Sequence, residues 1–231
     1  MNLVRRLLLA AALALPLAAQ PTELYQLVFL RPSPDRKPIA KEEAAKIQSA
    51  HMAHIRAMAD SGALVAAGPF GDTPPTISGV FVFKGSRDEV SRLASADPTV
   101  TAGRNTVEIY AWKGPKGVGE EYVKRHKADP KTPEDMGVHP FLILRRGPNW
   151  SRVGEFVPAH LEFIKKLRAS GKIAASGPIE GESEVAAIFV FQRMPDDEAR
   201  RLMADEPFVK NGVLTVEPHR WWCAAHVLPG W

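Results

Sequence analysis

The sequence predicts an α+β fold built from two copies of one βαββαβ module, with the two antiparallel sheets packed face to face. Two observations support this prediction. The chain repeats itself at a spacing of 109 residues over most of its length, and each copy shows the same order of apolar, β-rich runs and helical periodicity. The length of 231 residues is enough for one large or two small domains.

The repeat rests on rare residues that recur in the same order at the same spacing. His51 corresponds to His160, and Trp112 corresponds to Trp221. The other pairs are Gly62 and Gly171, Gly68-Pro69 and Gly177-Pro178, Leu93 and Leu202, Pro98 and Pro207, Gly103 and Gly212, and Glu108 and Glu217. One stretch, 81–83, corresponds to 189–191 at a spacing of 108. The loop before that strand is therefore one residue shorter in the second copy.

The first copy contains four predicted strands and two predicted helices. Residues 41–61 carry apolar side chains at helical spacing, and Gly62 ends the helix. Ser86 begins the second helix, and Glu89 completes a capping box three residues later. The β-rich runs that we expect as strands are 25–30, 63–67, which ends at Gly68-Pro69, 80–83 and 106–112.

The second copy repeats this order with strands at 141–144, 173–176, 187–191 and 214–222 and helices at 156–170 and 196–204. The βαββαβ order predicts a four-stranded antiparallel sheet with both helices on one face, which is the ferredoxin-like arrangement. The open face of each sheet is covered most simply by the other copy, so we expect an internal pseudo-dimer. The predicted domains are module one at 21–113, a solvated linker at 114–138 with one or two helical turns, and module two at 139–231.

The first twenty residues have the order of a secretory signal peptide. Arg5 and Arg6 precede the apolar run 7–17, and small residues follow that run. The run is shorter than the roughly 20 residues that a membrane-spanning helix needs. The sequence therefore predicts removal of residues 1–20 and export to the periplasm or the extracellular space, with no membrane association afterwards. The alternative is an uncleaved membrane anchor.

The charge of the exported chain argues against nucleic-acid binding. The whole chain carries +4, and removal of Arg5 and Arg6 leaves 28 basic against 26 acidic side chains, a net charge of +2. The single cysteine, Cys223, cannot form an internal disulfide. Either packing stabilises the fold or Cys223 pairs between chains, which leaves self-association open. The sequence shows no Gly-rich phosphate loop, Ser nucleophile elbow or heme-attachment motif, and we predict no cofactor.

Motifs that occur in the same order in both copies resemble the YCII-related domain family. In the first copy they are His51, Gly62, "GALVAAGP" at 62–69 and "ADPTVTAG" at 96–103. In the second copy they are His160, "GKIAASGP" at 171–178 and "ADEPFVKNG" at 204–212. The resemblance covers 25–113 and 140–222. It implies a dimeric α/β barrel, in which two modules pair through their sheets.

The resemblance also implies a paired histidine and carboxylate as the site. Carried over by position, the pairs are His51 with Asp97 and His160 with Glu206, and the second pair departs from the family by using Glu. At least one relative acts as a dehydrochlorinase on a chlorinated aromatic compound, so the resemblance implies an enzyme for small molecules. We expect both pairs at the edge of the interior that the two sheets share.

The same residues allow three interpretations. An inward histidine beside a carboxylate is suited to act as a general base, which favours a lyase or isomerase that acts on a small molecule. The pair could instead belong to a noncatalytic ligand-binding module, or fix a helix to a loop in a structural protein. His54 lies one turn from His51, but the second copy has Phe163 at that position. Because no third ligand lies at zinc-site spacing, we predict no metal site.

Two further features have a structural and a functional interpretation. Gly68-Pro69 and Gly177-Pro178 are typical of tight turns at strand ends, and they would also let a ligand approach the backbone closely. Trp112, Trp221 and Trp222 are expected to pack in the core or between the sheets, or to form an aromatic wall for an apolar ligand.

Overall fold

The computed structural model describes residues 21–73 and 75–229, so the expected signal peptide at 1–20 lies outside the described residues. The described chain forms two four-stranded antiparallel sheets, with the strand orders β2-β3-β1-β4 and β6-β7-β5-β8. The two identical orders confirm the predicted α+β fold with two modules. The first module contains β1 (Thr22–Pro32), α1 (Lys41–Asp60), β2 (Leu64–Pro69), β3 (Gly79–Phe83), α2 (Arg87–Ser95), α3 (Pro98–Thr101) and β4 (Asn105–Pro115).

The second module repeats these elements, and a helix precedes it. That helix is α4 (Glu120–Ala128). The module itself contains β5 (Gly137–Arg146), the 3-10 helix η1 (Trp150–Arg152), α5 (Val153–Ala169), β6 (Ile173–Pro178), β7 (Val185–Phe191), α6 (Asp196–Ala204), α7 (Pro207–Lys210) and β8 (Leu214–Cys223). The short helices α3 and α7 are additions to the predicted elements.

The two sheets face each other and close into a barrel along two seams. At one seam β2 meets β8, where Gly71 N donates a hydrogen bond of 2.8 Å to Arg220 O. At the other seam β4 meets β6, where Glu180 N donates a hydrogen bond of 2.8 Å to Ala111 O. Side chains from both sheets fill one shared core, which includes Tyr25, Phe29, Phe70, Trp112, Phe141, Ile143 and Trp221. The prediction that the two sheets pack face to face is therefore confirmed.

Two glycines allow the strands to approach closely at these seams. A Cβ atom on Gly68 would lie 1.9 Å from Trp222 O, and one on Gly177 would lie 2.0 Å from Lys113 O. These contacts are far shorter than a van der Waals contact, so only glycine fits. The recurring Gly-Pro motif therefore has a structural cause: the partner that approaches the backbone is the other module.

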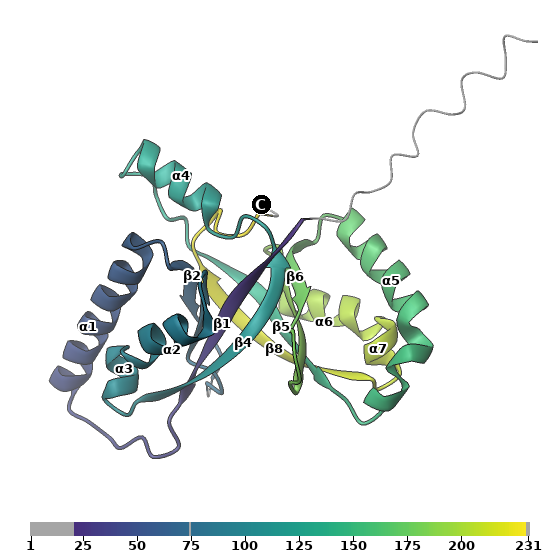
Figure 1. The fold of residues 1–231 in the computed structure, drawn as a ribbon, viewed down its shortest axis with the longest axis horizontal. Coiled ribbons are helices and arrows are strands. Elements are labelled where there is room, and N and C mark those ends of the chain that lie inside the picture. The colour runs from purple at the N-terminus through teal and green to yellow at the C-terminus, as the bar shows by residue number, and fades with distance from the viewer. Residues whose placement is uncertain (1–20, 74, 230–231) are drawn as a thin grey trace, which may run out of the picture.

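The helices cover the outer faces of the barrel. Figure 1 shows α1, α2 and α3 beside one sheet and α5, α6 and α7 beside the other, with the strands crossing between them. Each outer layer has its own apolar core, one around Met58, Phe81 and Phe83, the other around Leu167 and Phe191. The protein therefore has three apolar layers, and only the central one is shared by the modules.

The segment between the modules is partly packed. Helix α4 has no buried residue, as its polar composition predicts. Val118 just before it is fully buried, and Gly119 N donates a hydrogen bond of 2.7 Å to Val227 O. The linker is thus held against the C-terminal segment at one end of the barrel.

Cys223 and the tryptophans resolve two alternatives. Cys223 is fully buried in the shared core, so packing stabilises the fold and a disulfide between chains has no access to this thiol. Trp112 and Trp221 are also buried in that core, while the side chain of Trp222 is exposed. None of the helices in the described ranges has the length and hydropathy of a membrane span.

Candidate functional site

The structure brings His51 and Asp97 together. His51 Nδ1 lies 2.7 Å from Asp97 Oδ2. His51 is held on α1, and Asp97 is the residue before the first turn of α3. The imidazole keeps a small exposed fraction of 14%, whereas the carboxylate is completely buried. Since a carboxylate only accepts, Nδ1 must be the nitrogen that carries the proton.

The carboxylate of Asp97 is fixed from its other side by α3. Its Oδ1 accepts hydrogen bonds from Thr99 N at 2.8 Å and from Thr99 Oγ1 at 2.6 Å. Asp97 is therefore the N-cap of α3, and Pro98 stands at the first helical position. Burial favours the neutral acid, but the hydrogen bonds from His51 and Thr99 outweigh it and hold the pKa of Asp97 below its ordinary value.

A chain of polar side chains extends behind Asp97. Asn105 Nδ2 donates a hydrogen bond of 3.0 Å to Thr99 Oγ1, and Ser78 Oγ donates one of 2.9 Å to Asn105 Oδ1. Thr99 and Asn105 are buried. This chain connects α3 to β4 and to the residue before β3, so the orientation of Asp97 depends on three segments of the first module. These supporting residues were not predicted from the sequence.

The second module brings His160 and Glu206 together with the same distance of 2.7 Å, from Nδ1 to Oε1. Glu206 caps α7, and its Oε2 accepts a hydrogen bond of 2.9 Å from Val209 N. The longer side chain thus performs the same two tasks as Asp97. Phe208 stands where the first module has Thr99, and its ring stacks on His160 with a centroid distance of 4.1 Å. The second pair is therefore backed by an aromatic ring instead of polar side chains.

The pairs do not lie at the edge of the shared interior, so that expectation is wrong. His51 packs on Phe81, with ring centroids 6.1 Å apart, and Phe81 belongs to the outer core under α1 and α2. Phe208 likewise belongs to the outer core of the second module. The physical reason is that the helix faces carrying His51 and His160 are turned toward the outer surfaces of the sheets, while the other module covers the inner surfaces.

The free nitrogen of His51 faces the outside of the protein. In residues 21–73 and 75–229, Nε2 of His51 makes no hydrogen bond and is not a fully buried atom, so water reaches it. The neighbouring His54 is bound differently, because its Nε2 donates a hydrogen bond of 2.9 Å to Leu93 O. No group of three or more potential metal ligands occurs among the described residues.

Another cluster of polar side chains, centred on His219, joins the two modules at the barrel seam. His219 on β8 is buried, and its Nδ1 lies 2.5 Å from Asp72 Oδ2, which belongs to the loop after β2. Its Nε2 lies 3.2 Å from Glu217 Oε1, and Glu217 Oε2 accepts a hydrogen bond of 2.6 Å from Arg145 Nε. The hydrogen bond from His219 and the Arg145 guanidinium lower the pKa of Glu217 to about 2 against its burial. Both ring nitrogens of His219 are occupied, so this cluster holds the seam.

Comparison with protein families identifies the first module. The model of the YCII-related domain matches residues 26–113, which span β1 to β4 and include His51 and Asp97. Residues 26–113 are a YCII-related domain. No curated protein matches the sequence.

Solved structures are similar to this chain over most of its length at low sequence identity. A heme-binding protein from Thermus thermophilus is 15% identical, with a TM-score of 0.51, over 90% of this chain and 95% of the other. A candidate chlorite dismutase is 9% identical, with a TM-score of 0.53, over 88% and 94%. A candidate monooxygenase from Lactobacillus acidophilus is 10% identical over 88% and 94%, with a TM-score of 0.46. The first two similarities support the two-module ferredoxin-like barrel.

Proposed function

We propose that the YCII-related domain is an enzyme module for a small molecule, in which His51 is the general acid/base and Asp97 is its positioning residue. One observation carries this proposal: Nδ1 is held by a buried carboxylate while Nε2 is open to water. Asp97 fixes the ring orientation and the tautomer, so Nε2 keeps an unprotonated lone pair that is not bound to Asp97. This is the arrangement that a general base requires.

The proposed reaction is an elimination or isomerisation. Nε2 of His51 takes a proton from a carbon atom of the substrate, and the electron pair of that C–H bond forms a double bond. In an elimination, the leaving group departs with its own bonding electrons. In an isomerisation, the proton returns from Nε2 to another carbon. Asp97 stabilises the imidazolium that forms, because its anionic oxygen lies 2.7 Å from Nδ1.

The surroundings of His51 favour a small substrate with an apolar part. Met52, next to His51 on α1, is exposed, and the buried ring of Phe81 packs against the His51 ring. Two cavities, one lined by His219 and one lined by α4, lie elsewhere in the described structure. Substrate binding at His51 is proposed to use the outer surface beside α1, where the imidazole keeps its exposed fraction of 14%.

We propose further that the second module is a diverged YCII-related domain. It has the same strand order, and the His160–Glu206 pair has the same 2.7 Å distance. Phe208 replaces the polar support of Thr99, which favours a more apolar ligand or a structural role for this pair. Substituting His160 by Gln tests whether the second site contributes to turnover.

We also propose that the protein is exported after removal of residues 1–20, because their charge and hydropathy order is that of a signal peptide. N-terminal sequencing of the protein isolated from its native cells tests this proposal. A first residue near Pro21 supports it, and an intact Met1 contradicts it.

The acid/base proposal is tested with three variants of the purified protein. Small lactones, phenols and chlorinated aromatic compounds are screened, with product analysis and chloride release as readouts. For a compound that turns over, His51→Gln is expected to lower kcat at least about 100-fold, the usual range for a general base. His54→Gln is the matched control on the same helix, since His54 only donates to Leu93 O. Circular dichroism establishes that each variant is folded.

The outcomes separate the three interpretations. Loss of turnover in folded His51→Gln, with activity kept in His54→Gln, supports catalysis. Weaker binding of a compound that is never converted indicates a binding module. Full turnover in His51→Gln, or a lower melting temperature as its only effect, overturns the proposal and leaves His51 a structural link between α1 and α3.

A further inference from the structure

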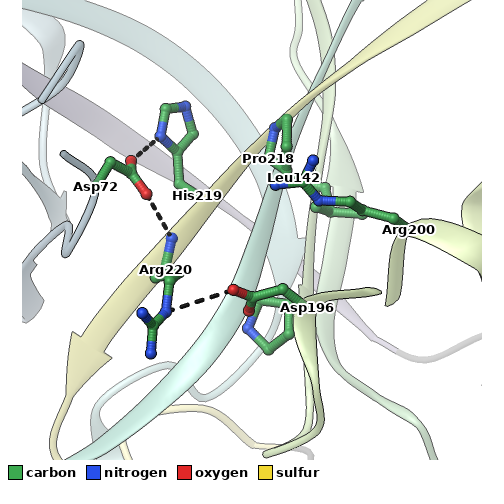
Figure 2. Close-up of a pocket in the computed structure, with 8 residues that line it drawn as sticks. Asp72, Leu142, Asp196, Arg200, Pro218, His219 and Arg220 are labelled. Carbon is green, nitrogen blue, oxygen red and sulfur yellow. Dashed lines mark hydrogen bonds and ion pairs between the residues drawn. The ribbon is translucent and has the colours of Figure 1, made fainter. Parts of the chain in front are cut away.

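A small cavity lies outside the histidine–carboxylate pairs, against the outer face of the second sheet. It has a volume of about 60 Å³. One wall is formed by Pro140 and Leu142 of β5 and Pro218 of β8, and another by the start of α6. Asp72 reaches it from the first module, so both modules contribute to its lining (Figure 2).

The acidic side chains of this cavity are already paired. Asp72 accepts from His219 Nδ1 at 2.5 Å and from Arg220 N at 3.2 Å, which occupies both carboxylate oxygens. Asp196 Oδ2 lies 3.4 Å from Arg220 Nε. Figure 2 shows these contacts on one side of the cavity and Arg200 on the other. Positive charge that enters the cavity would therefore find no unpaired carboxylate in its lining.

Among the described residues, Arg200 is the arginine of the cavity lining that has no acidic partner. It lies one helical turn after Asp196, where an ion pair along α6 is expected. Asp196 turns to Arg220 instead, and in the described part of the chain Arg200 makes no ion pair. The next residue, Arg201, forms such an ion pair, because its Nη1 lies 2.5 Å from Asp197 Oδ2 one turn earlier in α6. The guanidinium of Arg200 is thus available to an anion at the cavity.

The first module does not repeat this arrangement. At a spacing of 109 residues, Ser91 stands where the second module has Arg200, and Arg87 stands where it has Asp196. Arg87 Nη1 donates a hydrogen bond of 2.9 Å to Ile109 O, the counterpart of Pro218. The combination of an unpaired arginine and a proline-lined wall is specific to the second module.

We propose that this cavity binds a short-chain organic carboxylate. The carboxylate group pairs with the Arg200 guanidinium, whose planar fork matches two oxygens. The short apolar chain packs on Pro140, Leu142 and Pro218, which offer no hydrogen-bonding side-chain group. The volume of about 60 Å³ restricts the ligand to a few carbon atoms. This site does not involve His51 and is independent of the function proposed above.

The test is a nuclear magnetic resonance titration of the isotope-labelled full chain with propionate, at constant ionic strength in sodium chloride. Propionate is expected to shift the signals of Leu142, Asp196 and the Arg200 Nε–H in a saturable way. Propionamide, which has the same shape without the charge, should bind at least about ten-fold more weakly. Arg200→Gln should weaken propionate binding by at least about ten-fold, whereas the matched control Arg201→Gln should leave it unchanged.

Three results would overturn the proposal. These are no saturable shift with propionate, equal binding of propionamide, or unchanged propionate binding in Arg200→Gln. Since Arg200 is an exposed side chain on α6, the variant is expected to fold, and its spectrum establishes this directly.

Discussion

His51 and Asp97 are separated by 46 residues in the sequence and by 2.7 Å between Nδ1 and Oδ2. His160 and Glu206 repeat both values. The distance is kept although one acid is longer by a methylene group, because each acid also caps a short helix, at a position that suits its length. Both modules therefore form the same histidine–carboxylate pair.

The first prediction concerns the charge of Asp97. In Asp97→Asn the side chain can still cap α3, but His51 loses its anionic partner, and we expect a loss of about 1–3 kcal/mol of stability at pH 7. The folded-state pKa of Asp97 lies below its ordinary value, so its stabilisation is present above pH 3.8 and disappears as the pH falls through the folded value. Urea denaturation at pH 7 and pH 3 measures both effects. An equal difference between wild type and variant at the two pH values would contradict this account.

The second prediction concerns Thr99. Thr99→Val removes the hydroxyl that donates to Asp97 and leaves Asn105 Nδ2 without its acceptor. We expect a loss of about 1–3 kcal/mol in urea denaturation. Thr101→Val is the matched control, because the Thr101 hydroxyl is exposed and bonds only to Pro98 O. Its effect should stay within about 0.5 kcal/mol. Equal effects of the two variants would show that the polar chain behind Asp97 has no special role.

The third prediction concerns the barrel seams. Gly68→Ala and Gly177→Ala each place a methyl group within 2.0 Å of a backbone oxygen of the other module. The seam must open to accommodate it, and we expect a loss of about 1–3 kcal/mol. Gly154→Ala on α5 is the control, because a Cβ atom there meets nothing within 4 Å. That variant should be neutral or slightly more stable in thermal denaturation, so a loss as large as at Gly68 would contradict the seam explanation.

The fourth prediction concerns Glu217. Its pKa of about 2 in the folded protein lies below the ordinary value of 4.5. A lowered carboxyl pKa stabilises the fold above pH 4.5, and this contribution is lost as the pH falls toward 2. Stability curves of wild type and Glu217→Gln from pH 6 to pH 2 should therefore converge at the acid end. Parallel curves would mean that Glu217 is not linked to His219 and Arg145 as described.

The repeat made most of the fold predictable. Residues at the 109-residue spacing supplied the module boundaries, and apolar alternation supplied the strands, which form in the predicted order. The two histidine–carboxylate pairs also form, because the helix face and the Asp-Pro or Glu-Pro step recur together. The sequence even contained the signal for α3 and α7, since an acid before proline is typical of a helix start.

Other features were not predictable, for physical reasons. The periodicity of α1 predicts that its His51 face packs against the protein, but it does not show whether the inner or the outer surface of the sheet covers that face. The position of the pairs at the outer surface was therefore not predictable from the sequence. The link between Asp72 and His219 has no counterpart in the first module, where Tyr110 replaces His219, and it joins residues 147 positions apart. A repeat cannot reveal a contact that only one copy makes.

The most direct test of the central claim is the tautomer of His51, read from the ring nitrogen signals of the labelled protein in a long-range proton–nitrogen spectrum. The account predicts that neutral His51 carries its proton on Nδ1, with an unprotonated Nε2 that is free to act as a base. A neutral His51 protonated on Nε2 would contradict it, because such a ring could neither donate to Asp97 nor accept a proton from a substrate at its open nitrogen.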